Sequence, residues 1–342
     1  MKLVTFAVRR AEGHLVRAGV LLGDVIVDVD LALAGQGREP VASGRSGGDS
    51  SLLRLISGGE RVIEATREAT ARAVEKGTDR LGDARILYPA GDVQLVSPLP
   101  RPNSLRDYLV IEEHLRGVIA AGVIKDVPDE WYRIPAHYKG NIDEIYGPDD
   151  TVPWPAYTGK LDYELEVCAV IGTPGRRIRV GDAGRHIVGY TLYNDWSARD
   201  IQAREMSIGN GPGISKDFGS SLGPCIATPD EFDLRTAHLE ARIDGEVWSA
   251  GTLGTMQFSF EELIEWTSQE QTLRPGDLLG SGTIGKGCGV ELGRWLTEGC
   301  QVELEAEGIG ILRNRVGYRG QGPRRAVDIV SRSEECTATT SS

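Results

Sequence analysis

Two glutamates that alternate along a strand-like run are the first residues whose type and spacing suggest chemistry. In an extended chain, residues 161–171 place Glu164 and Glu166 on one face, about 7 Å apart, and apolar residues on the other. On an arbitrary strand such a pair faces solvent, which screens the repulsion between the two carboxylates. The apolar continuation of this run is instead typical of a strand that is buried on both faces. The alternative to solvent screening is a positive charge between the two groups.

A third acid, Asp195, follows the strand-like run of residues 187–193. Arg199 and Gln202 come four and seven positions after it, which suits a ligand-binding corner followed by a helical turn. An equally good interpretation is that Asp195 caps a helix at a strand–helix junction. Three carboxylates without a nearby Cys or His cluster would suit a hard cation with oxygen ligands, first Mg²⁺ or Mn²⁺ and then Ca²⁺.

Asp107 and His114 are seven residues apart in a segment, residues 104–121, that we predict to be a helix. Ser104 is the expected N-cap, with Asp107 three residues later in a pattern like a capping box. Seven steps of about 100° bring two side chains to nearly the same face of a helix. Asp107 is therefore either a cap or a site residue, and His114 is either a partly buried polar residue or an acid–base group.

Residues 219–223 match the G-x-S-x-G pattern of serine hydrolases, with Ser221 as the nucleophile. No clear strand leads into this pattern, and His238 is too close downstream for the usual order of a Ser–Asp–His triad. We retain a serine hydrolase only as a minor alternative.

The elements that must position these residues indicate an α+β chain that is predominantly β. We expect a small β-rich domain over residues 1–95, a larger domain over 96–320 and a loose polar tail over 321–342. The first domain begins with a meander over residues 3–30 and contains one or two helices in residues 51–77. Residues 126–160 are rich in proline and aromatic residues and favour an ordered lid. Strand-like runs then dominate, and residues 243–247 predict a hairpin; the runs are 163–171, 187–193, 238–243, 246–249, 277–281 and 301–307.

Composition narrows the class of protein further. The formal net charge of −12 argues against a nucleic-acid partner, which needs a basic patch. No apolar run approaches the roughly 18 residues of a membrane helix, and no signal-peptide core follows Met1. The 5 cysteines are widely spaced without a C-x-x-C pair, as expected for reduced thiols. We therefore expect a soluble cytoplasmic protein without a membrane partner.

Five segments, in this order along the chain, resemble the fumarylacetoacetate hydrolase family. They are residues 161–166 (LDYELE), 194–202 (NDWSARDIQ), 215–219 (SKDFG), 221–224 (SLGP) and 273–283 (LRPGDLLGSGT). The resemblance extends from about residue 100 to 318, and the N-terminal meander also looks like the small leading domain of this family. It implies a mixed β-sandwich roll, a divalent metal, usually a homodimer, and a small oxo or enol acid as substrate.

The resemblance also implies roles for individual residues. The metal ligands would be Glu164, Glu166 and Asp195, with Asp107 as the fourth ligand of the hydrolase branch. His114 would be the general base, and Glu291 the acid that orients it. The groups around the reacting carbonyl would be Arg199, Gln202 and Lys216, and the further ligand-contacting positions would be Tyr138 and Thr283.

Two departures from the family pattern bear on the reaction. The decarboxylase-like branch often has a glutamate three residues after its lid histidine; Gly117 stands there, so the pairing of His114 with Glu291 is the better match. Polar substrate contacts of the tyrosine-catabolic hydrolase are replaced by apolar residues, which predicts a more apolar pocket and a substrate other than fumarylacetoacetate; the positions are Leu109, Val123 and Met206.

The leading hypothesis is metal-dependent hydrolysis of a C–C bond in a small β-diketo or acylpyruvate-like acid. The metal would stabilise an enolate, His114 would activate water, and polar side chains would stabilise the oxyanion. The alternative within the family is a decarboxylase, isomerase or hydratase of a 2-oxo acid. A third hypothesis is a non-catalytic or repurposed biosynthetic member that binds a metabolite.

Overall fold

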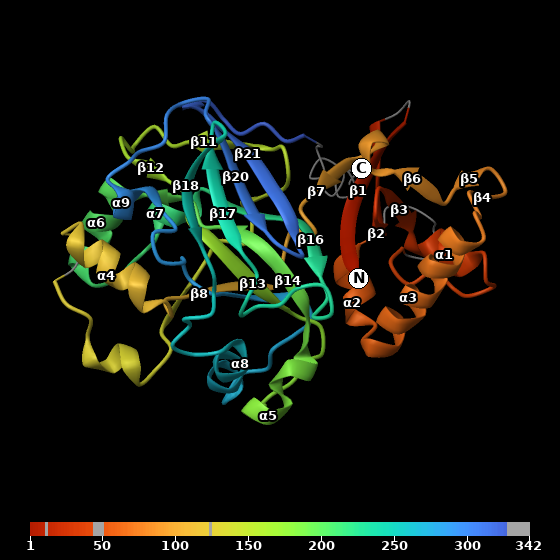
Figure 1. Ribbon diagram of the computed structural model, residues 1–342, viewed down its shortest axis with the longest axis horizontal. Helices are drawn as coiled ribbons and strands as arrows, with labels where there is room; N and C mark the ends of the chain where they lie inside the picture. The colour runs from red at the N-terminus through yellow and green to blue at the C-terminus, as the bar shows by residue number, and fades with distance from the viewer. Residues whose placement is uncertain (11–12, 44–50, 123–124, 327–342) are drawn as a thin grey trace, which may run out of the picture.

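The computed structural model describes residues 1–10, 13–43, 51–122 and 125–326 (Figure 1). The chain begins with the predicted meander, whose strands are β1 (Lys2–Arg10), β2 (Gly13–Leu22) and β3 (Val25–Asp28). The turn between β2 and β3 places Gly23 at a φ of +60°, a backbone conformation that glycine adopts without a steric cost.

Helices pack against this meander and confirm the prediction for residues 51–77. They are α1 (Val29–Ala34), α2 (Leu52–Ser57) and α3 (Glu60–Glu75). Val20, Leu33 and Leu55 belong to one buried cluster, so the strands and helices of this part share a core. Short elements then lead to the larger part: β4 (Arg80–Leu81), β5 (Ala84–Arg85), β6 (Leu87–Pro89), a 3₁₀ helix (Ala90–Asp92) and β7 (Gln94–Val96).

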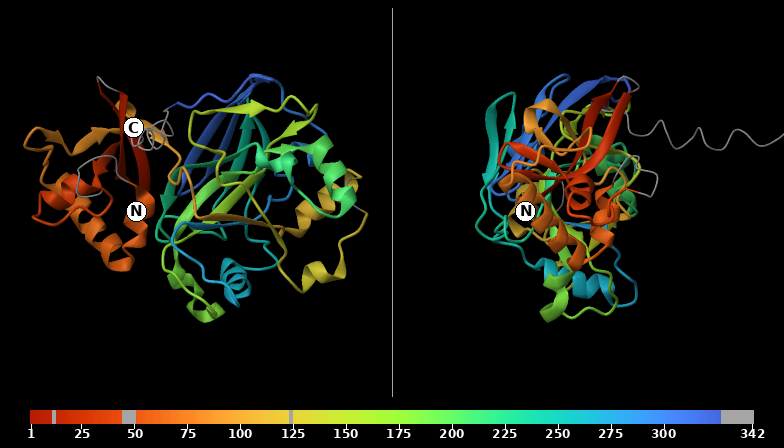
Figure 2. Two further views of the ribbon diagram at one scale, coloured as in Figure 1. Left: turned by 180° about the vertical axis from the view of Figure 1, so that it is seen from behind. Right: turned by 90° about the vertical axis from the view of Figure 1, so that its right-hand side faces the viewer.

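The main sheet runs through both parts of the molecule (Figures 1 and 2). Within the described residues it has 12 strands, ordered β6-β3-β2-β1-β16-β14-β13-β19-β8-β9, with β10 on β16 and β7 on β1. The N-terminal meander joins the larger part where β1 pairs antiparallel with β16. The strands not yet given are β8 (Ser104–Tyr108), β9 (His137–Lys139), β10 (Ile145–Tyr146), β13 (Leu165–Ile171), β14 (Ile187–Asn194), β16 (Ser220–Ala227) and β19 (Asp277–Gly280).

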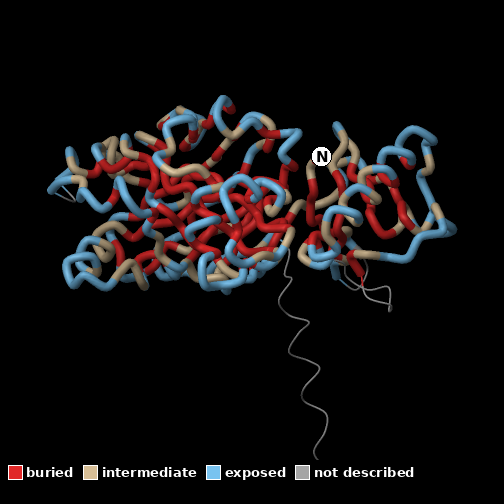
Figure 3. The backbone as a smooth tube through the Cα atoms, turned by 90° about the horizontal axis from the view of Figure 1, so that it is seen from below, coloured by how far each residue is buried: buried red, intermediate tan, exposed pale blue. Residues whose placement is uncertain are grey.

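A second sheet of 5 strands, among the described residues, completes the larger part in the order β11-β21-β20-β17-β18. Val167 and Leu192 of the main sheet share one buried cluster with Leu304 of the second, so the two sheets enclose a common core (Figure 3). β17 and β18 form the predicted hairpin. The strands are β11 (Thr151–Trp154), β17 (Leu239–Ile243), β18 (Glu246–Gly251), β20 (Gln301–Ala306) and β21 (Gly310–Arg319).

The expected fold class, α+β and predominantly β, is confirmed. Helices lie around the margins of the two sheets (Figure 2), and a small ladder joins β12 (Leu161–Asp162) to β15 (Ser197–Ala198). The helices are α4 (Glu112–Ala120), α5 (Val180–Ala183), α6 (Arg199–Ile208), α7 (Ile214–Asp217), α8 (Phe260–Ser268) and α9 (Gly289–Leu292), with 3₁₀ turns at Asp129–Tyr132 and Gly184–His186.

The predicted helix over residues 104–121 is wrong in its first half. Residues 104–108 form strand β8, which pairs parallel with β19, and the helix α4 begins only at Glu112, after Ile111. Short runs of this composition suit either element, and here pairing with a central strand decided the outcome. Asp107 therefore lies on a strand and caps no helix, and the argument that it shares a helix face with His114 fails.

The segment predicted to be a lid is built into both sheets. β9 and β10 add to the main sheet and β11 to the second, with only short irregular stretches between them. At the start of the predicted tail, the N–H of Ala326 donates to Asp150 Oδ1 at 2.6 Å, and residues 327–342 lie outside the described residues. No helix among the described residues is long and apolar enough to cross a membrane.

Candidate active site

Three buried carboxylates converge from strands β8 and β13 and from the end of β14. Asp107 comes from β8, Glu166 from β13 and Asp195 from the residue after β14, and one oxygen of each lies within 4.8 Å of the other two. Three buried oxygens, Asp107 Oδ1, Glu166 Oε2 and Asp195 Oδ1, have no hydrogen-bond partner among the described residues. Buried acceptors without donors are costly, so this cluster is built for a group that the protein chain itself does not supply.

The electrostatics of the cluster point to a cation. Burial, then the charge of Asp195, raises the pKa of Asp107 to about 8. Burial, then the charge of Asp107, raises the pKa of Glu166 well above its ordinary value, and burial raises that of Asp195. Like charges in a dry site favour the protonated forms until a positive charge joins them. An all-oxygen donor set of this kind suits Mg²⁺ or Mn²⁺, with Ca²⁺ next.

Glu164 stands apart from these three residues, although the sequence predicts it as a metal ligand. Its Oε1 accepts from an Arg199 guanidinium nitrogen at 2.8 Å, and its Oε2 accepts from Lys216 Nζ at 2.5 Å. Burial opposes ionisation, but the charges of Arg199 and Lys216 outweigh it and hold the pKa of Glu164 below its usual range. The structure thus divides the four predicted ligands into a group of three and a fourth that is paired with cations.

Lys216 links Glu164 to the carboxylate cluster. It lies on the short helix α7, and its Nζ also contacts Asp195 Oδ2. Burial disfavours the ammonium, but Asp195 and Glu164 more than compensate and raise the pKa of Lys216, so it stays charged. The two predicted ligand-contacting residues face the same cluster: Tyr138 OH donates to Asp195 Oδ2 at 2.7 Å, and Thr283 Oγ1 donates to Glu166 Oε1 at 3.0 Å.

Arg199 is held by a residue to which the sequence analysis assigned no role. Its Nε donates to Asp162 Oδ2 at 2.8 Å, and one of its terminal nitrogens donates to Gln202 Oε1 at 3.0 Å. Asp162 also accepts from the backbone N–H groups of Gly289, at 2.7 Å, and Val290, at 3.0 Å. The only signal for Asp162 in the sequence was its place within the 161–166 segment.

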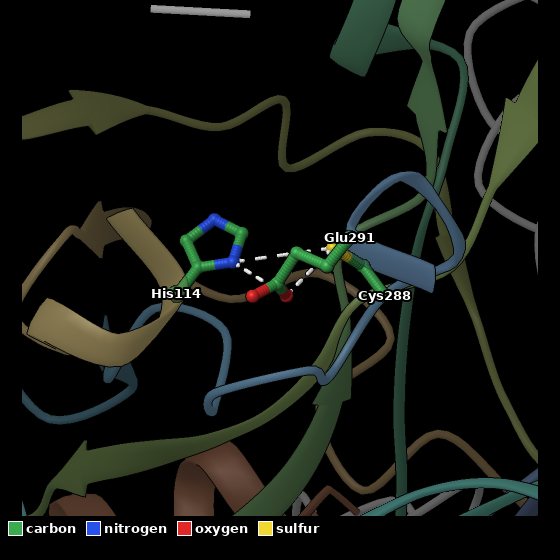
Figure 4. A group of neighbouring side chains, drawn as sticks. All are labelled: His114, Cys288 and Glu291. Carbon is green, nitrogen blue, oxygen red and sulfur yellow. Dashed lines mark hydrogen bonds and ion pairs between the residues drawn. The ribbon is translucent and has the colours of Figure 1, made fainter. Parts of the chain in front are cut away.

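His114 and Glu291 form a buried pair at the contact between α4 and α9 (Figure 4). His114 Nδ1 lies 2.9 Å from Glu291 Oε2, and the backbone N–H of Lys286 donates to Glu291 Oε1 at 3.0 Å. The other ring nitrogen, Nε2, points away from Glu291 (Figure 4). The backbone of Glu164 forms an isolated antiparallel bridge with that of Cys288, which places the pair close to Glu164. Cys288, also without a predicted role, contacts both residues of the pair.

Two further expectations can be compared with the structure. Ser221 is buried within β16 and its Oγ accepts from Trp196 Nε1 at 2.8 Å, which does not suit the exposed nucleophile of a serine hydrolase. Of the apolar substitutions in the predicted pocket, Leu109 and Met206 are exposed. Val123 lies outside the described residues.

Residues 106–317 match the family described as the fumarylacetoacetate (FAA) hydrolase C-terminal family, and the chain belongs to this family. Among curated relatives, oxaloacetate tautomerase YisK of Bacillus subtilis (strain 168) is 30% identical over 273 residues, which cover 78% of this chain and 86% of that protein. The mitochondrial oxaloacetate tautomerase FAHD2A of Homo sapiens is 29% identical over 272 residues, which cover 78% of this chain and 79% of the relative.

Solved structures show the same fold. Fumarylacetoacetate hydrolase from Exiguobacterium antarcticum superposes with a TM-score of 0.67 at 25% identity, over 93% of this chain and 100% of that one. Maleylpyruvate hydrolase from Sphingobium sp. SYK-6, solved in complex with manganese(II) and pyruvate, gives a TM-score of 0.67 at 24% identity, over 93% and 99% of the two chains.

Proposed function

We propose that this protein is a divalent-metal-dependent enzyme that interconverts the keto and enol forms of a small 2-oxo acid similar to oxaloacetate. The observation that carries the proposal is the convergence of three carboxylates whose buried oxygens have no partner among the described residues, together with the buried His114–Glu291 pair in the same domain. The similarity to two oxaloacetate tautomerases over 78% of the chain supports tautomerisation in particular.

The residues present fit a hard cation. Asp107, Glu166 and Asp195 would hold it, because they offer buried oxygens that no donor of the described residues satisfies. When bound, Mg²⁺ or Mn²⁺ would withdraw electron density from the carbonyl of a 2-oxo acid and so acidify the adjacent C–H bond. Thr283 and Tyr138 orient the ligand carboxylates of Glu166 and Asp195 by donating to their second oxygens.

His114 is the group that moves the proton. The carboxylate of Glu291 accepts from Nδ1–H, which leaves the lone pair on Nε2 to take a proton from the carbon next to the carbonyl. The electron pair of that C–H bond moves toward the carbonyl oxygen, and return of the proton to oxygen completes the enol. Lys216 and Arg199 keep positive charge near the site while this negative charge develops.

Hydrolysis of a C–C bond in a β-diketo or acylpyruvate-like acid is the second candidate. The same Nε2 can take a proton from water instead of carbon, so the His114–Glu291 pair suits either reaction. The likeness to fumarylacetoacetate hydrolase from Exiguobacterium antarcticum, at 25% identity, favours keeping this candidate. The two reactions differ in product, since tautomerisation conserves the carbon skeleton and hydrolysis divides it.

The test uses metal-stripped protein reloaded with Mg²⁺ or Mn²⁺. We expect it to accelerate the decay of the ultraviolet absorbance of enol-oxaloacetate, and chromatography should show that no carbon skeleton is cleaved. His114→Gln should lose at least about 100-fold in rate while it still binds the metal. Cleavage of an acylpyruvate or release of CO₂ as the fastest reaction would replace tautomerisation by the alternative, and no turnover of any 2-oxo acid would contradict the proposal.

We further propose the homodimer and the cytoplasmic location that the sequence analysis expects. Light scattering on the full chain should give twice the monomer mass of 37.0 kDa, and a single-chain mass would contradict the dimer. Fractionation of the source cells tests the location.

A further inference from the structure

The His114–Glu291 pair and the neighbouring Cys288 form a second group of potential metal ligands. His114 Nδ1, Cys288 Sγ and Glu291 Oε2 offer one nitrogen, one sulfur and one oxygen from three buried side chains (Figure 4). Sγ lies 3.1 Å from the carboxylate oxygen and 3.9 Å from Nδ1, and Nδ1 lies 2.9 Å from that oxygen. This donor set differs in kind from the all-oxygen set of Asp107, Glu166 and Asp195.

The spacing of the three atoms suits a small tetrahedral cation. Bonds from zinc to sulfur, nitrogen and oxygen of about 2.0–2.3 Å, at tetrahedral angles, separate the donor atoms by about 3.3–3.6 Å. The three observed separations depart from this range by less than about 0.5 Å, so small side-chain rotations would admit the ion. Three protein ligands would leave a fourth position open to water.

We propose that His114, Cys288 and Glu291 form a second cation site, selective for thiophilic divalent ions such as Zn²⁺ or Cd²⁺. Thiolate and imidazole favour these ions, whereas Mg²⁺ and Mn²⁺ prefer the carboxylate cluster. A thiolate and a carboxylate together neutralise the charge of a divalent ion, which lowers the free-energy cost of burying it at this place. The site binds the ion whether or not the proposed tautomerisation is correct.

Binding at this site requires two proton movements and no electron transfer. In the free protein, the Cys288 thiol donates its proton in a hydrogen bond to Glu291 Oε2. When the ion binds, the thiol releases that proton to solvent and the sulfur becomes a ligand. His114 must present a lone pair at Nδ1, so its ring proton moves to Nε2.

The shift of the His114 proton to Nε2 would inhibit the enzyme, a consequence that rests on the proposed function. Once Nε2 carries the proton, it can no longer accept one from substrate, and Glu291 no longer orients the ring. A thiophilic ion would therefore inhibit the enzyme without displacing Mg²⁺ from the carboxylates. Occupancy by zinc would act as a switch that turns off the proton-transfer group.

The test is a titration of the full-length, Mg²⁺-saturated protein with Cd²⁺, followed through the ultraviolet charge-transfer absorption of a cadmium–thiolate bond. We expect one equivalent of Cd²⁺ to give this band, with release of one proton that a pH indicator records. Cys288→Ser should abolish the band, and Glu291→Gln should weaken binding at least about tenfold. For the natural chain and for each variant, the rate in the presence of Zn²⁺ is divided by the rate of the same protein without Zn²⁺.

Cys300→Ala is the matched control, because Cys300 is also buried and free but lies outside this cluster, and it should retain the band. Thermal melts establish that each variant is folded. His114→Gln provides a second variant at the site, in which weaker Cd²⁺ binding is expected. A band that survives Cys288→Ser, or no band at several equivalents of Cd²⁺, would overturn the proposal. Because the readout is absorbance, the result does not depend on whether oxaloacetate is the substrate.

Discussion

At the scale of single residues, the contact between Glu291 and His114 depends on the missing side chain of Gly117. A Cβ atom built on Gly117 would lie 2.1 Å from Glu291 Oε1 and 2.8 Å from its Cδ. The carboxylate thus occupies the space above helix α4 that a side chain at 117 would fill. Gly117, which the sequence analysis treated only as a departure from the family pattern, is a condition for this pair.

Gly117→Ala should therefore impair activity without unfolding the protein. Alanine favours the helix by about 1 kcal/mol over glycine, but its methyl group must push Glu291 away from Nδ1. A displacement of about 1 Å at a catalytic group costs roughly 100-fold in kcat, which steady-state kinetics would measure. Gly181→Ala is the control, because Gly181 is also helical and no atom of the described residues lies within 4 Å of a Cβ atom built there. Equal rates for the two variants would contradict this account.

The sequence, mainly through its resemblance to the family, named most of the residues that the structure brings together, but not how they divide into groups. Alternation predicted Glu164 and Glu166 as one group, whereas in the structure Arg199 and Lys216 engage Glu164 and one oxygen of Glu166 has no partner among the described residues. Cys288 carried no motif, and its contact with Glu291 depends on the turn that begins α9. Such pairings depend on tertiary packing, which spacing along a single chain does not encode.

At the scale of elements, the carboxylate cluster depends on three neighbouring strands in the order β13-β19-β8. Gly280 on β19 is the residue opposite Asp107 on β8 and Cys168 on β13. A Cβ atom at Gly280 would lie 2.5 Å from Asp107 Oδ1, so the carboxylate reaches the cluster only because β19 has no side chain there. The middle strand thus keeps the space for Asp107 open.

Gly280→Ala should weaken Mg²⁺ or Mn²⁺ binding by about tenfold or more, because it displaces one ligand carboxylate. Isothermal titration calorimetry on metal-stripped protein measures the effect. In an Asp107→Ala background there is no carboxylate for the new methyl group to displace. Gly280→Ala should then cause little further loss of metal affinity. Additive losses in the double variant would show that Gly280 acts by another route.

The strands themselves illustrate what the sequence could predict about elements. The runs at 187–193, 238–243 and 301–307 were placed within a residue or two, because alternation or sustained apolar character marks a strand. The run at 104–108 was assigned to a helix, because Ser104 and Asp107 have the spacing of an N-cap and a capping box. This run becomes a strand only by pairing with β19, which lies more than 170 positions away in the sequence.

At the scale of the whole molecule, the carboxylate cluster makes stability depend on pH. A carboxyl group with a raised pKa in the folded state binds its proton more tightly there than in the unfolded chain. Unfolding free energy must then fall as pH rises from the unfolded pKa, about 4, to the folded value, which is about 8 for Asp107. Below that window both states are protonated and the penalty disappears.

Metal-free protein should accordingly melt at a lower temperature near pH 8.5 than near pH 6, with a loss on the order of 1 kcal/mol or more. Mg²⁺ or Mn²⁺ should reverse this loss and stabilise more at the higher pH, because binding needs the deprotonated carboxylates. Calorimetric melts with and without metal measure both effects. Asp107→Asn removes one of the titrating groups and should flatten the pH dependence of the metal-free protein. The proposal would be contradicted if the melting temperature of metal-free Asp107→Asn depended on pH as strongly as that of the natural chain. It would also be contradicted if the metal stabilised the protein equally at both pH values. Either result would mean that these carboxylates do not cause the loss of stability at high pH.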